Sequence, residues 1–147
     1  MRIHNLLALA AGLTVSTVLF AASPALAEMM KMSATLEGAQ EVPPVESPGK
    51  GTAEITFDTE SKKLDWTLEY SGLTGDATAA HFHGPAAKGE NADVAVPMED
   101  AKSGATGSAT LTDAQAADLT AGKYYVNVHT AAHPGGEIRG QVEKSAM

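Results

Sequence analysis

Residues 51–70 read GTAEITFDTESKKLDWTLEY, and this stretch decides the class of fold. Apolar residues occupy every second position in both halves, with Ile55 and Phe57 in the first half and Trp66 in the second. Side chains of a strand point alternately to opposite faces, so each half has one apolar face that needs a core. The stretch therefore predicts an antiparallel hairpin, with Phe57 and Trp66 buried.

Further strands, a short helix and turn regions are predicted on both sides of the hairpin. Residues 112–119 predict one or two helical turns, with Thr112 as the N-cap and Gly122 ending them. Residues 101–108 are small and rich in Gly, and they predict a turn region. Short strands between frequent Gly and Pro residues predict an all-β fold, an antiparallel Greek-key-like β-sandwich or barrel. The further strands are expected at 32–36, 77–84, 94–96, 109–111, 124–130 and 137–142.

Residues 1–27 have the pattern of a secretory signal peptide. A short basic start is followed by an apolar run over 6–22 and by Ala25-Leu26-Ala27, which fits an A-x-A cleavage motif. A retained membrane anchor is the alternative, since the run is about long enough to cross a bilayer, but Pro24 follows it and no basic flank does. We expect cleavage to leave a single domain over residues 28–147, exported to the periplasm or the cell exterior, with no membrane span.

The composition excludes several classes of function. The chain has 10 basic and 18 acidic residues, and Arg2 is the only charged residue in the first 27, so the remainder has a formal charge of −9. An acidic surface repels phosphate, which argues against nucleic acid and anionic lipid as partners. The chain has no cysteine, which excludes thiolate nucleophiles and thiolate metal sites. A metal site would use His, carboxylate, Met or backbone ligands.

Four histidines follow the signal segment, and they carry most of the chemical information: His81, His83, His129 and His133. Residues two apart on a strand face the same side, about 6.6 Å apart, so His81 and His83 project together while Phe82 faces the core. His129 lies near the end of another predicted strand, and His133 lies in the loop after it. If the two strands are neighbours, the imidazoles meet, and they predict a transition-metal site for copper before zinc.

The alternative is structural, because histidines at strand ends often only bond to backbone carbonyls. Asn127 shares a face with His129, where it could orient a ligand or be a satisfied polar residue. Arg139 could steer small anions, but an ion pair with Glu137 or another carboxylate is the favoured interpretation.

Two further groups of residues are weaker candidates. Asp76 and Glu90 flank the His-x-His segment, and they are interpreted as solvated turn residues rather than as partners of ligand imidazoles. Met29, Met30 and Met32 could offer thioether ligands to Cu(I), but a flexible start that leads into a strand is the favoured interpretation.

Five segments have distinctive motifs: EVPPV (41–45), AHFHGP (80–85), LTAG (119–122), YVNVHT (125–130) and PGGEIRGQ (134–141). Together they resemble the CHRD (chordin) domain family over about residues 32–142. The resemblance implies a small exported single-domain protein with an immunoglobulin-like or superoxide-dismutase-like fold. The family takes its name from chordin, an extracellular antagonist of growth factors, so the resemblance also implies that a protein partner is an alternative to a metal.

A weaker likeness is to copper/zinc superoxide dismutase, a Greek-key sandwich with a His-x-His strand that supplies copper ligands. That likeness assigns His81 and His83 to the pair, His129 to the late ligand and Arg139 to the guiding arginine. The chain departs from the dismutase pattern because it has no disulfide and no bridging histidine with a separate zinc cluster. The likeness therefore supports a copper site more than an enzyme.

The sequence leaves three functions open. An exported protein that sequesters or delivers copper through the histidine cluster is favoured. A metal-free extracellular protein-binding module and a superoxide dismutase-like copper enzyme are the alternatives, since fold-level likeness is a weak guide to function.

Overall fold

The predicted hairpin is present and lies at the centre of one half of the sheet. In the computed structural model, which describes residues 26–146, β2 (Lys50–Asp58) pairs antiparallel with β3 (Lys63–Ser71). Phe57 and Trp66 are buried, at 2% and 6% exposure. The prediction of this hairpin and of its core residues is confirmed.

The strands of the described residues form one antiparallel sheet in the order β5-β4-β7-β8-β1-β2-β3-β6, and β9 pairs with β1. The elements besides the hairpin are β1 (Met29–Glu37), the 3-10 helix η1 (Gly38–Gln40), β4 (Ala77–His83), β5 (Val94–Met98), β6 (Ala105–Thr110), α1 (Asp113–Thr120), β7 (Tyr125–Thr130), β8 (Ile138–Gln141) and β9 (Glu143–Lys144).

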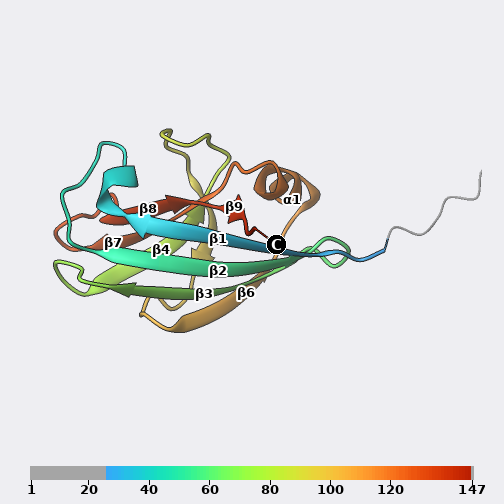
Figure 1. The fold of residues 1–147 in the computed structure, drawn as a ribbon, viewed down its shortest axis with the longest axis horizontal. Coiled ribbons are helices and arrows are strands. Elements are labelled where there is room, and N and C mark those ends of the chain that lie inside the picture. Colours follow the sequence, from blue (N-terminus) through green and yellow to red (C-terminus); the bar gives the residue numbers. More distant parts are fainter. Residues whose placement is uncertain (1–25, 147) are drawn as a thin grey trace, which may run out of the picture.

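The sheet folds into two layers around one core (Figure 1). β1, β2, β3 and β6 form one layer, and the layer with β4, β7 and β8 joins it where Glu37 of β1 pairs with Arg139 of β8. Trp66 of β3 and Phe82 of β4 meet edge to face between the layers, with ring centroids 5.2 Å apart. The all-β antiparallel sandwich or barrel is therefore confirmed, with β5 and β6 as the two ends of the sheet.

The turn region predicted over 101–108 is wrong in its second half, because β6 begins at Ala105 and pairs with β3. Gly107 lies opposite Trp66, and a Cβ at this position would come within 2.4 Å of the indole ring. A strand of small residues leaves room for the indole. Such a strand lacks the alternating apolar residues by which a strand is recognised in a sequence.

β1 begins at Met29, so the methionine-rich start is part of a strand rather than flexible. Met32 lies in the core at 2% exposure, whereas Met29 is 58% exposed. Alternation along the strand points Met29 to the opposite face from Met30 and Met32. The three thioethers therefore do not converge on one Cu(I) ion.

The helix starts as predicted. The Thr112 hydroxyl accepts from the Gln115 backbone N–H, and the Gln115 side chain accepts from the Thr112 N–H, which forms a capping box.

The signal peptide expected over 1–27 lies almost wholly outside the described residues. Within residues 26–146, no helix has both the length and the apolar character needed to cross a membrane.

Candidate metal site

Strands β4, β7 and β8 carry a polar outer face. From Ala80 onward, the apolar even-numbered residues of these strands, such as Phe82 and Val126, belong to the core, so the odd-numbered residues face outward. The register sets His81 opposite Asn127, and Asn127 opposite Arg139. Asn127 and Arg139 are only 2% exposed, because loops cover much of this face.

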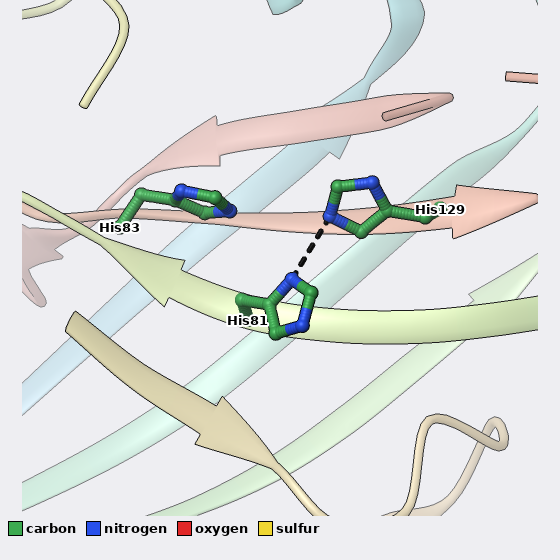
Figure 2. A group of neighbouring side chains, drawn as sticks. All are labelled: His81, His83 and His129. Carbon is green, nitrogen blue, oxygen red and sulfur yellow. Dashed lines mark hydrogen bonds between the residues drawn. The ribbon is translucent and has the colours of Figure 1, made fainter. Parts of the chain in front are cut away.

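His81, His83 and His129 converge on this face (Figure 2). They are the one group of His, Cys, Asp or Glu side chains in residues 26–146 that is arranged to hold an ion, with ligand nitrogens within 4.8 Å of one another. His81 Nδ1 lies 3.0 Å from His129 Nε2. The convergence depends on the antiparallel pairing of β4 with β7, which the spacing of the histidines alone did not establish.

Two backbone carbonyls determine which nitrogen of each ring is free. His83 Nδ1 lies 2.9 Å from the Ala92 carbonyl oxygen, and His129 Nδ1 lies 2.9 Å from that of Pro134. A carbonyl oxygen can only accept, so both Nδ1 atoms carry the proton. The Nε2 atoms of His83 and His129 therefore hold lone pairs, and His81 Nδ1 donates to the lone pair of His129.

The environment of the rings favours their neutral form. Burial lowers the pKa of His81, and the neighbouring His129 and His83 lower it further. Burial also lowers the pKa of His83, against the opposing effect of its hydrogen bond to the Ala92 carbonyl. Neutral imidazole is the form that binds a metal, so these rings need little deprotonation before they can act as ligands.

Arg139 holds a loop over the site instead of pairing with a carboxylate. Its guanidinium donates to the Asn91 side-chain oxygen at 2.9 Å and to the Glu90 carbonyl, and it lies 3.5 Å over the ring of Tyr125. Tyr125 in turn stacks on His83, with the ring planes 2° apart. The predicted ion pair of Arg139 is wrong, and so is its role as a guiding arginine, because the guanidinium is buried and engaged.

Glu137, the expected partner of Arg139, is bound by other donors. Its carboxylate accepts from the hydroxyls of Ser47, Thr74 and Thr130 and from the Thr74 backbone N–H. Burial opposes the ionisation of Glu137, but these hydrogen bonds outweigh it and lower the pKa to about 2. Neutral donors from two distant segments and from nearby Thr130 therefore take the place of the arginine.

A buried carboxyl that the sequence analysis did not assign lies beside Asn127. Glu41 is 5% exposed, and its Oε1 and the Asn127 Nδ2 lie within 2.6 Å of where a Cβ of Gly136 would be. Gly136 also has a φ of 123°, which favours glycine. Burial raises the pKa of Glu41 to about 7, against the opposing effects of Arg139 and Asn127. The residue belongs to the EVPPV motif, but the motif does not show that it reaches β7.

The remaining candidates lie outside the cluster. His133 sits in the turn between β7 and β8, where its backbone exchanges hydrogen bonds with Thr130, and it is not a member of the converging group. Backbone carbonyls, not the carboxylates of Asp76 or Glu90, orient two of the rings. Glu90 contributes only its carbonyl, which accepts from Arg139.

The comparisons with known proteins agree with the motifs. A model of the CHRD domain matches residues 32–142, which include β4, β7, β8 and the three converging histidines. The chain belongs to the CHRD domain family. No curated protein and no solved structure matches it. For this CHRD domain, the polar face of β4, β7 and β8 is therefore the main source of functional information.

Proposed function

We propose that this CHRD domain binds one transition-metal ion, copper(II) by preference, through His81, His83 and His129. The proposal rests on the direction of the lone pairs of the imidazole nitrogens. The Nε2 atoms of His83 and His129 both carry lone pairs, because carbonyls engage both Nδ1 atoms, and the ligand nitrogens of the three rings lie within 4.8 Å of one another. A hydrogen bond at the other ring nitrogen is the usual arrangement of a metal-binding histidine.

His81 completes the site with a small rearrangement. Without metal, its Nδ1 shares a proton with His129 Nε2 across 3.0 Å. An ion takes the place of that proton, so that both nitrogens bind the ion and His81 carries its proton on Nε2. Bonds from imidazole to zinc are about 2.0–2.1 Å long, so two nitrogens at this separation already suit neighbouring positions around one ion.

The donors favour copper(II) over zinc. Imidazole sites bind divalent first-row metals in an order that peaks at copper(II), and the chain has no cysteine to favour zinc or Cu(I). With residues 1–27 acting as a signal peptide, the domain would work outside the cytoplasm. Its role there would be to sequester copper or to deliver it.

Titration of copper(II) into the metal-free protein by calorimetry tests the proposal. We expect one ion per chain, and at a free concentration 100 times Kd the ion should raise the free energy of unfolding by about 2.7 kcal/mol. The double variant His81→Ala/His83→Ala should lose affinity by about 100-fold or more, because it lacks two ligands.

His133→Ala is the matched control, because it removes a histidine that lies outside the converging group. It should bind copper(II) as the unmodified protein does. Equal affinity of the double variant and the unmodified protein would contradict the site.

A further inference from the structure

The cluster contains hydrogen-bond acceptors without a matching donor. His83 Nε2 and Asn127 Oδ1 are both buried, and neither has a hydrogen-bond partner among residues 26–146. His83 Nε2 has no proton to donate, because Nδ1 carries it. Leaving a buried acceptor unpaired costs about 1–3 kcal/mol. Gln141 Oε1 is also unpartnered, but it belongs to β8, whereas these two acceptors belong to the strands that carry the histidines, where an occupant that attracts lone pairs would satisfy both.

Asn127 is placed at the centre of the histidines. It lies directly across from His81 in the register of β4 and β7, and two positions before His129 on its own strand. His83 pairs with Tyr125, which lies two positions before Asn127 on β7, so His83 and Asn127 are diagonal neighbours on the same face. The position of Asn127 in the sheet is therefore next to the positions of all three histidines.

The orientation of the amide is fixed from its other side. Asn127 Nδ2 donates to the Gly135 carbonyl at 3.5 Å and lies beside the Glu41 carboxyl. The Gly135 carbonyl can only accept, so the amide nitrogen faces it. The oxygen is thereby left on the opposite side of the amide from Glu41.

We propose that Asn127 Oδ1 is the fourth donor to the ion, an inference that rests on the metal-binding function proposed above. The ion is then held by three imidazole nitrogens and one amide oxygen, while the Gly135 carbonyl holds the amide from behind. An oxygen donor favours divalent copper or zinc over Cu(I), which prefers soft sulfur ligands. The site is therefore selective for the oxidation state of copper.

Asn127→Leu tests this inference by removing the oxygen at nearly the same volume. We expect copper(II) affinity to fall on the order of 10- to 100-fold, as for residues that hold or orient a metal site. We also expect faster relaxation of water protons by the bound copper(II), because a water molecule enters the vacated position. Gln141→Leu is the control, since it removes another buried amide with an unpartnered oxygen on the same face.

A second variant covers the case in which Asn127→Leu does not fold. Glu41→Gln/Asn127→Asp reverses the donor and acceptor behind the site and keeps an oxygen facing the rings. It should bind copper(II) at least as tightly as Glu41→Gln alone, with unchanged water relaxation. Weaker binding of this double variant would overturn the inference.

The outcomes separate the two proposals. Copper(II) binding that Asn127→Leu leaves unchanged in affinity and in water relaxation would overturn the role of Asn127 and leave the histidine site intact. A protein that binds no copper(II) at all would overturn both. Loss of affinity in Asn127→Leu and not in Gln141→Leu would support the fourth donor.

Discussion

At residue 41 a carboxyl group is buried without a full set of donors, and this gives the protein a stability that depends on pH. The pKa of Glu41 is raised by burial from 4.5 to about 7, so the folded state binds its proton more tightly than the unfolded state does. The free energy of unfolding should therefore fall as pH rises from 4.5 to about 7.

Glu41→Gln should remove this dependence, because an amide keeps the shape without the charge. The free energy of unfolding of the variant, minus that of the unmodified protein, should be larger at pH 8 than at pH 4, by on the order of 2 kcal/mol. Urea unfolding across this range measures the difference. If the free energies of unfolding of the two proteins changed in parallel with pH, the raised pKa of Glu41 would be contradicted.

Single residues also show how far the sequence could predict the site. His81 and His83 follow from the strand period of two, and this spacing needs no tertiary information. Arg139 and Glu137 have the same spacing but do not pair, because Asn91 and Glu90 bind the arginine, and hydroxyls that include two from distant segments bind the glutamate. Partners that come from loops leave no periodic pattern in the sequence.

At the scale of elements, Glu137 joins the segment before β2, the turn after β3 and the end of β7. Its acceptors are filled by Ser47, Thr74 and Thr130, and its pKa is lowered to about 2. A carboxyl with a lowered pKa stabilises the fold above its ordinary pKa of 4.5, and that stability is lost as pH falls toward 2.

Glu137→Gln should therefore cost about 2 kcal/mol at pH 7, and the deficit should shrink as the pH falls toward 2. Chemical unfolding at several pH values checks both parts. Glu46→Gln, which changes an exposed carboxyl near Ser47, should have little effect. A deficit that is constant from pH 7 to pH 2 would argue against the ionised network.

The packing of β6 against β3 depends on Gly107, which lies opposite Trp66. Gly107→Ala would bring a Cβ within 2.4 Å of the Trp66 ring, so the strand or the indole must move. We expect a loss of about 1–3 kcal/mol in the free energy of unfolding, the usual cost of overpacking. Gly75→Ala, at a glycine with no atom within 4 Å of its Cβ position, is the control. Equal stability of the two variants would contradict this account.

For the whole molecule, the sequence predicts most strands and the all-β class, but the order of strands depends on long-range pairing. The cluster forms because β7, which lies more than forty residues after β4 in the chain, pairs directly with it. The sequence pattern of β4 or of β7 alone does not specify that the two strands pair. The motifs AHFHGP and YVNVHT indicate the site together because they occupy these two adjacent strands.

The contact between Trp66 and Phe82 also has an optical consequence. Trp66 is the one tryptophan of the chain, and Phe82 lies between His81 and His83 of β4 on the opposite face of the same strand. An ion at the cluster is therefore separated from the indole by a single layer of sheet. Paramagnetic copper(II) should quench the indole fluorescence at this range, whereas zinc(II), with a filled d shell, should leave it nearly unchanged.

Quenching should be absent from His81→Ala/His83→Ala, and undiminished emission from the unmodified protein at saturating copper(II) would place the ion elsewhere. The core contact between the two layers would thereby make the indole fluorescence a reporter of copper(II) at the histidine cluster.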